Sequence, residues 1–103
     1  MKTKIRVSTQ LEAFVKSLAP DPRHRLRQAL KKLATGEGDT KSLEGNLAGY
    51  CRLSISGYRI IYREQTIHGV RTVDCIFAER RALVYEMFAS LLVEHAMDQA
   101  TKG

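Results

Sequence analysis

Cysteine is scarce in this sequence of 103 residues, and long hydrophobic runs are absent from it. The two cysteines, Cys51 and Cys75, lie far apart inside apolar segments, which predicts two reduced core residues and disfavours a disulfide between neighbouring strands. No segment approaches the roughly 20 apolar residues that a membrane helix needs. The first residues also lack the apolar stretch of a secretory signal, so we expect a cytoplasmic protein with no membrane partner.

Potential metal ligands are also few. The histidines, His24, His68 and His95, are scattered, and the cysteines form no Cys-x-x-Cys pair. We therefore expect neither a metal nor another cofactor. The length suits one hydrophobic core, so we expect residues 1–103 to form a single domain.

Acidic residues are outnumbered by basic ones. Seventeen lysines and arginines stand against eleven acidic residues, which gives a net charge of +6 and a pI near 9.6. Such an excess favours an anionic partner, with nucleic acid ahead of a membrane surface or an acidic protein. The excess supports such a partner only if the folded protein gathers these charges on one surface.

The beginning of the chain predicts a strand followed by a helix. Residues 3–8 alternate polar and apolar side chains, as a strand with one buried face does. Thr9 and Glu12 match the Ser/Thr-x-x-Glu capping box that begins a helix. The dipeptide Ala19-Pro20 ends this helix, because a residue before proline avoids the helical region.

A second, strongly basic helix follows. Asp21 is its expected N-cap and Pro22 lies in its first turn, while Gly36 and Gly38 end it. Five cations cover the faces that the apolar stripe leaves: Arg23, Arg25, Arg27, Lys31 and Lys32. This charge run is typical of a solvated helix face, and phosphate binding is the alternative.

The rest of the chain predicts a loop, three strands and a last helix. Residues 35–49 are rich in Gly, Thr, Ser, Asp and Asn, as loops are. Strands are expected over 49–55, 58–64 and 70–78, and a helix from about residue 82. The predicted fold is therefore α+β, with a small, mostly antiparallel sheet, an N-terminal helical hairpin on one face, and a C-terminal helix.

The segment GYCRLSISGYRIIYRE, residues 49–64, predicts its own register. If Ser56-Gly57 is a two-residue turn, apolar residues oppose one another in three pairs: Ile55 and Tyr58, Leu53 and Ile60, Cys51 and Tyr62. The other face then carries Tyr50, Arg52, Ser54, Arg59, Ile61 and Arg63. In the next strand the same alternation assigns Val73, Cys75 and Phe77 to the core, and Thr72, Asp74 and Ile76 to the opposite face.

Polar residues gather where the last strand meets the last helix. In FAERRALVYEMF, the residues Glu79, Arg80, Arg81 and Tyr85 directly follow the strand. Strand ends and helix beginnings commonly line sites, and a helix N-terminus attracts phosphate. Arginine and tyrosine together suit RNA, because guanidinium groups bind phosphate and aromatic rings stack on bases.

The two segments LAGYCRLSISGYRIIYRE and FAERRALVYEMF resemble the RelE/ParE superfamily of bacterial toxins, and the likeness extends over nearly the whole chain. RelE-like members are implied to be metal-independent endoribonucleases that cut messenger RNA in the ribosomal A site. An antitoxin, usually encoded by a neighbouring gene, holds them inactive. ParE-like members share the fold and inhibit DNA gyrase. The motifs here lie closer to the RelE side.

The resemblance also implies roles for individual residues. Arg59 matches the arginine that contacts the scissile phosphate, and Tyr85 matches the tyrosine that stacks on or orients the target nucleotide. Arg80 or Arg81 matches a second phosphate-binding arginine. This chain departs from the family at the paired strand lysines, whose positions Tyr50 and Arg52 occupy. It departs again at Glu79, where many relatives have histidine.

Acid–base chemistry narrows these roles. Arginine cannot be deprotonated in a protein, so Arg52 and Arg59 can only stabilise charge. Glu79 is the one ordinary base of the cluster, and the alternative is that it merely pairs with Arg52 or Arg81. We therefore predict catalytic roles for Arg59, Arg81, Tyr85 and Glu79. We predict RNA binding by Arg52, Arg63, Arg80 and Tyr50.

Three functions follow from these observations. The leading hypothesis is a toxin that cleaves messenger RNA on the ribosome and inhibits translation, with an acidic antitoxin as partner. The first alternative is a ParE-like, non-enzymatic inhibitor of DNA gyrase. The second is a degenerate member that only binds an antitoxin or RNA.

Overall fold

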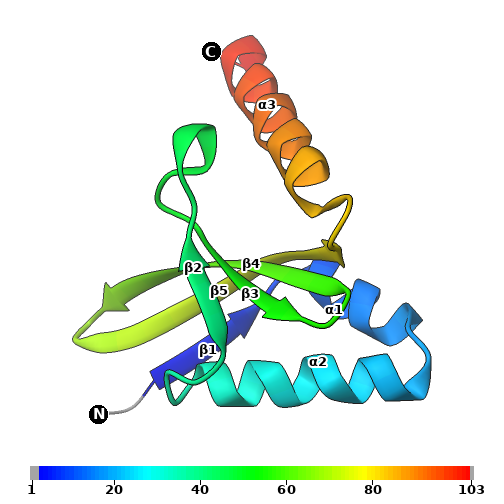
Figure 1. Cartoon of the computed structure of the whole chain (residues 1–103). Helices are drawn as coiled ribbons and strands as arrows, with labels where there is room; N and C mark the ends of the chain where they lie inside the picture. Colours follow the sequence, from blue (N-terminus) through cyan, green and yellow to red (C-terminus); the bar gives the residue numbers. More distant parts are fainter. Residues whose placement is uncertain (1–2, 103) are drawn as a thin grey trace.

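The computed structural model describes the backbone of residues 3–102 and the side chains of residues 3–97. A five-stranded sheet, with strand order β1-β5-β4-β3-β2, carries helices on both faces (Figure 1). The elements in chain order are β1 (Thr3–Val7), α1 (Thr9–Ser17), α2 (Pro20–Leu33), β2 (Asp39–Ser42), a 3₁₀ helix η1 (Gly45–Leu47), β3 (Cys51–Ile55), β4 (Tyr58–Ile67), β5 (Val70–Arg80) and α3 (Val84–Lys102). Only the β1–β5 pair is parallel, so the predicted α+β architecture is confirmed.

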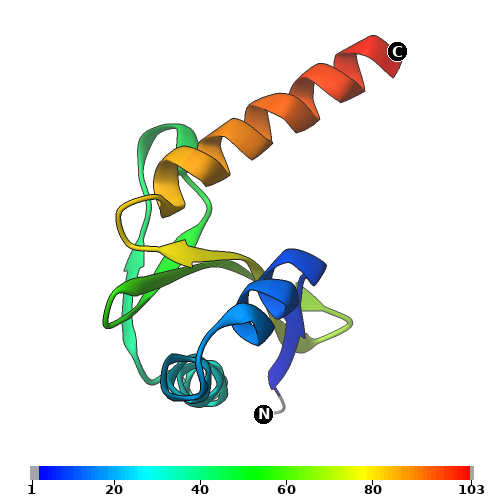
Figure 2. The same ribbon diagram turned by 90° about the vertical axis from the view of Figure 1, so that its right-hand side faces the viewer.

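The layers follow from the apolar pattern. Helices α1 and α2 lie against one face of the sheet, and α3 rises from the other face (Figures 1 and 2). None of the described helices combines the length and the hydropathy of a membrane span. Both cysteines are free thiols, as predicted, with Cys75 buried and Cys51 half-buried.

The capping predictions for the first two helices are wrong by one or two residues. Ser8, not Thr9, is the N-cap of α1, and its hydroxyl oxygen accepts the Leu11 N–H at 3.1 Å. The Ser8 hydroxyl also donates to the Ile76 carbonyl, so this contact with β5 selects the cap. Helix α2 begins at Pro20 with Ala19 as N-cap, because proline is tolerated at a first helical position whose N–H has no intrahelical partner.

The hairpin register is confirmed. Residues Ile55, Leu53 and Cys51 lie opposite Tyr58, Ile60 and Tyr62. Their shared face packs on α1 and α2 in the larger core cluster. Its buried members are Leu11, Val15, Leu26, Leu33, Leu53, Ile60, Tyr62, Val73, Cys75 and Ala78.

The assignment of Phe77 to this core is wrong. Residues Ile61 and Tyr62 of β4 pair with Phe77 and Cys75 of β5, so Ile76 is an extra residue in a β-bulge. A bulge reverses the alternation beyond it, which turns Phe77 to the α3 face and brings Ala78 into the larger core. The predicted placement of Val73 and Cys75, which precede the bulge, is confirmed.

The α3 face is only partly cationic. A second core cluster covers its centre, where α3 packs against the sheet; its buried members are Leu47, Ile61, Phe77, Val84 and Phe88. The rings of Phe77 and Phe88 lie 5.8 Å apart. Polar and charged residues therefore lie to either side of this cluster instead of covering the whole face.

Strand β2 lies inside the predicted loop, which is a further correction. All four of its side chains are exposed, so the segment shows no apolar alternation that could reveal a strand. It forms an antiparallel pair with β3, in which Thr40 lies opposite Leu53. Just before it, Gly38 has φ +123°, and a Cβ there would lie 2.8 Å from the Leu53 Cδ1 atom. Glycine is therefore required where this edge strand enters the sheet.

Candidate functional site

The sheet register brings three of the predicted site residues onto the α3 face at one end of the hairpin. Arg59 of β4 lies between Ser54 of β3 and Glu79 of β5. In the adjacent row, Arg52 lies opposite Ile61, which belongs to the second core. The central strands therefore place two guanidinium groups and one carboxylate along a single edge of that core.

The two arginines are held by neighbours on their own hairpin and on β2. The Arg59 Nη1 donates to the carbonyl oxygens of Ser56 at 3.1 Å and Tyr58 at 2.8 Å. Arg52 donates to the Ser54 hydroxyl, and its Nη1 lies 3.8 Å from the Asp39 carboxylate. No described carboxylate pairs with Arg59, so its charge is available to an anion.

Glu79 is the most enclosed ionisable residue of this group, with 12% of its side chain exposed. Its Oε1 accepts the backbone N–H of Arg80 at 2.9 Å and lies 3.9 Å from the Arg80 guanidinium. The alternative that Glu79 pairs with Arg52 or Arg81 is therefore wrong, because Arg80 is its ionic partner. This bond occupies one carboxylate oxygen.

The segment after β5 is tied to the hairpin turn. The Arg81 N–H donates to the Gly57 carbonyl at 2.8 Å, which holds the two cationic segments side by side. The side chains of Arg80 and Arg81 are exposed. In the register Arg80 is opposite Tyr58, a residue of the α1–α2 face, so Arg80 and Glu79 start from opposite faces of the sheet.

The two predicted tyrosines both contact the second core. Tyr85, the second residue of α3, is half-buried beside it. The ring of Tyr50 meets the ring of Phe88 edge-on at 5.1 Å between centroids. Packing therefore restricts both rings, and Tyr50 in particular is positioned by α3.

Arg63 and Tyr50 lie apart from Arg59 and Glu79. They line a cavity of about 470 Å³ between the sheet and the overhanging part of α3, together with residues that include Arg6, Asp74, Ile76 and His95. Arg63 is paired in register with Asp74, two residues beyond Ile61 along β4. Along β4, Ile61 of the second core therefore separates Arg63 from Arg59.

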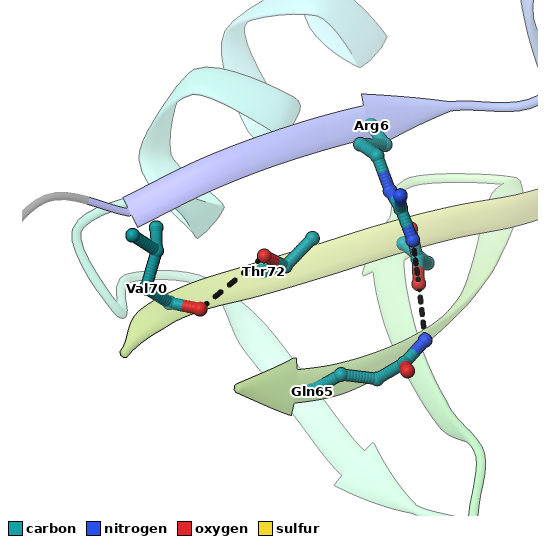
Figure 3. Close-up of polar contacts among 5 residues, drawn as sticks. Arg6, Gln65, Val70 and Thr72 are labelled. Atoms are coloured by element: carbon teal, nitrogen blue, oxygen red, sulfur yellow. Dashed lines mark hydrogen bonds and ion pairs between the residues drawn. The ribbon is translucent and has the colours of Figure 1, made fainter. Parts of the chain in front are cut away.

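Sequence reasoning missed Arg6 as part of this cavity, and it assigned Asp74 to this face without giving it a role. Arg6 of β1 donates to both Asp74 oxygens, at 2.5 and 3.0 Å, and Gln65 of β4 donates to the same carboxylate at 2.5 Å (Figure 3). The hydrogen bond from Arg6 lowers the pKa of Asp74 below its ordinary value. No local pattern signals this contact, because β1 and β5 are about 70 positions apart in the chain.

The group formed by Arg52, Arg59 and Glu79 can stabilise charge and contains one base. Arg52 and Arg59 can stabilise negative charge, and Glu79 can accept a proton. Among the side chains that the structure describes, no cluster of three His, Cys, Asp or Glu residues could hold a metal ion.

Solved structures with a similar fold include toxins and toxin–antitoxin complexes. The chain superimposes on the RelBE2 toxin–antitoxin complex of Mycobacterium tuberculosis with a TM-score of 0.67 and 22% identity, covering 79% of this chain and 100% of that one. The YoeB/ParE toxin of Agrobacterium tumefaciens superimposes with a TM-score of 0.62 and 16% identity, covering 76% of this chain and 98% of that one. The archaeal RelE–RelB complex of Pyrococcus horikoshii superimposes with a TM-score of 0.60 and 19% identity, covering 79% of this chain and 97% of that one.

The chain has the RelE/ParE toxin fold. No protein-family model and no curated protein sequence matches it. The RelE/ParE fold therefore rests on the course of the backbone, and it agrees with the family resemblance of the two sequence segments. Within this fold the hairpin arginines and the segment after β5 occupy adjoining positions.

Proposed function

We propose that residues 1–103 form a single RelE/ParE-like toxin domain, the toxin component of a type II toxin–antitoxin system. Its activity is metal-independent, ribosome-dependent cleavage of messenger RNA, which inhibits translation in the cytoplasm. The observation that carries this proposal is the row formed by Arg59 and Glu79 on the α3 face, with Arg52 beside it. It supplies charge for a phosphate and one carboxylate within the same row.

The proposed mechanism uses the 2′-hydroxyl of the substrate as nucleophile. Glu79 accepts the 2′ proton, and Arg59 stabilises the negative charge of the pentacovalent phosphate. Arg81 binds the neighbouring phosphate, and Tyr85 orients the nucleotide or donates a proton to the leaving 5′ oxygen. Arg52, Arg63, Arg80 and Tyr50 bind the rest of the strand.

Ribosome dependence suits this set of residues. The Arg59 guanidinium bonds to the hairpin carbonyls, and Glu79 bonds to the Arg80 N–H. A substrate must compete with both contacts, so binding energy from a large partner is needed to align the groups. The ribosome can supply this energy by holding the messenger strand in place.

An antitoxin is the proposed protein partner. Five large apolar side chains of α3 and the residue before it are exposed: Leu83, Met87, Leu91, Val93 and Met97. Exposed apolar residues on a helix favour a partner that covers them with a helix-forming segment. The net charge of +6 favours an acidic one, encoded by a neighbouring gene, whose association weakens as salt rises.

The alternative is a ParE-like inhibitor of DNA gyrase that performs no chemistry. Tyr50 and Arg52 replace the family's lysine pair, and both are engaged in contacts within the protein. A degenerate member that only binds an antitoxin or RNA is the second alternative.

Expression of the chain alone in bacteria tests the proposal. We expect translation to stop and primer extension to reveal new 5′ ends within messenger RNA. Arg59→Ala and Tyr85→Ala should abolish or reduce both effects, while Arg71→Ala, which alters an arginine that pairs with Glu64 away from the candidate site, should retain them. Stalled replication with intact messenger RNA would indicate gyrase inhibition. Absence of toxicity would indicate a degenerate member that only binds an antitoxin or RNA.

A further inference from the structure

Helix α2 holds most of the net charge of the protein. Its fourteen residues include five cations and a single carboxylate, Asp21, which makes +4 of the chain's +6. None of the five cations forms an ion pair with a carboxylate in the described part of the chain. By contrast, Arg6, Arg52 and Arg71 on the strands each have a carboxylate neighbour.

The cations of α2 also repel one another. Arg23, Arg27 and Lys31 follow at intervals of four residues, so each lies one turn from the next. Like charges at this spacing destabilise a helix. A helix that only needed a solvated face could alternate signs, as α1 does with Glu12 and Lys16, whose ion pair is 2.9 Å long.

The location of α2 separates it from the candidate cleavage site. Helix α2 packs on the larger core, on the face of the sheet opposite α3 (Figures 1 and 2). Its cations therefore lie on the side of the sheet opposite the face that carries Arg59. A groove of about 260 Å³ runs between α2 and β3, lined by Arg25, Gln28 and Lys32 on the helix side.

The composition of this surface favours nucleic acid over protein. The exposed large apolar side chains of the described chain lie on β1, on α3 and just before α3, and none lies on α2. Most protein interfaces are anchored by a few buried aromatic or apolar side chains, whereas phosphate contacts need only positive charge and hydrogen-bond donors. Along about 21 Å of helix, α2 offers charge and donors with no anchor.

We propose that the solvent-facing side of α2 binds the sugar-phosphate backbone of structured RNA, as a second surface separate from the candidate cleavage site. The choice of RNA rests on the proposed function, because a ribosome-bound toxin is surrounded by folded RNA. The surface binds by charge and shape without reading sequence. It holds the protein on RNA while the opposite face engages the messenger strand.

The test compares two triple variants of equal charge. Arg25→Gln/Arg27→Gln/Lys31→Gln removes three cations from α2, and Lys4→Gln/Lys41→Gln/Arg71→Gln removes three from β1, β2 and β5; each lowers the net charge from +6 to +3. Binding to a 2′-O-methyl RNA hairpin is measured by fluorescence anisotropy over a salt series. This probe cannot be cleaved through a 2′-hydroxyl, so the outcome does not depend on the proposed activity.

We expect the α2 triple variant to bind the hairpin at least tenfold more weakly at about 0.1 M salt. The slope of log affinity against log salt should fall by roughly 2 to 3, at about 0.9 per phosphate contact. The strand triple variant should change the slope by less than about 1. Equal losses in both triple variants would overturn the proposal, because net charge alone would explain them.

Three further measurements keep the test decisive. The melting temperature of the α2 triple variant should equal or exceed that of the parent, because glutamine retains helix propensity and the repulsion is removed. The single variant Lys31→Glu, which should lower the slope by about 1 or more, replaces the triple variant if that one unfolds. Poly-glutamate serves as a second probe, and if the α2 variant loses more affinity for it than for RNA, the surface binds protein and the proposal fails.

Discussion

Arg59 and Glu79 lie directly opposite each other on β4 and β5, yet neither bonds to the other. Each is held by backbone groups near it: Arg59 by the Ser56 and Tyr58 carbonyls, and Glu79 by the Arg80 N–H. A cross-strand cation and carboxylate that are not paired can both face a substrate. This relationship is the basis of the proposed charge stabilisation and proton transfer.

Glu79→Gln tests the proposed base. The amide cannot accept the 2′ proton, so we expect messenger cleavage to slow by about 100-fold or more. Stability should remain near that of the parent, since the amide oxygen can still accept the Arg80 N–H. The measurements are a cleavage time course on ribosome-bound message and the melting temperature. Glu64→Gln is the matched control, and a parental rate in Glu79→Gln would make Glu79 a structural partner of Arg80 only.

Arg59→Lys separates charge from geometry. Lysine keeps the positive charge but lacks the forked donors that a phosphate accepts, so we expect cleavage to fall by about 10-fold or more. The melting temperature should change little, because Arg59 contributes no ion pair within the described chain. Full activity in Arg59→Lys would indicate that charge alone matters at this position.

Gly38→Ala should destabilise the fold by about 1–3 kcal/mol. The backbone there has φ +123°, and the added Cβ would lie 2.8 Å from the buried Leu53 side chain. Urea denaturation gives the free energy of unfolding. Gly36→Ala is the control: its φ is +80° but no atom lies within 4 Å of an added Cβ, so its loss should be smaller. Equal losses would mean that backbone strain, not the contact with Leu53, decides the cost.

Asp74→Asn should make stability less dependent on pH in the acidic range. The hydrogen bond from Arg6 lowers the pKa of Asp74 in the folded protein below its ordinary 3.8. This carboxylate therefore stabilises the fold above that value, and the contribution is lost as pH falls through the lower folded-state pKa. The variant should melt a few degrees below the parent near pH 7, and the difference should shrink below about pH 4. A constant difference would show that the loss comes from packing.

The two thiols should differ in reactivity. Burial raises the pKa of Cys75 to about 12, and its side chain is enclosed in the larger core, while Cys51 is half-buried. Because thiolate and access control the reaction, a maleimide should label one thiol per chain in the folded state and two in denaturant. Cys51→Ser should then show no labelling of the folded protein. Rapid labelling of Cys75 in that variant would contradict the packing of β5 on α1.

Local patterns were sufficient to predict much of this fold. The alternation in residues 49–64 encodes a two-residue turn and one register, because a slip would bury arginines. The same pattern predicted that Arg52, Arg59 and Arg63 share one face. Helix α3 was predicted from its apolar spacing, and it begins at Val84, two residues after the expected start.

The sequence by itself therefore determined the order of elements, the hairpin register and the concentration of charge on α2, since these depend on neighbours in the chain. Only the tertiary structure decided three further features: the bulge at Ile76, the edge strand β2, and the separation of Arg63 from Arg59 by the second core. Each depends on contacts between distant segments, such as Phe77 with Phe88 and Arg6 with Asp74. The energy of such contacts is set by packing and pairing across the fold, which no local pattern of residues records.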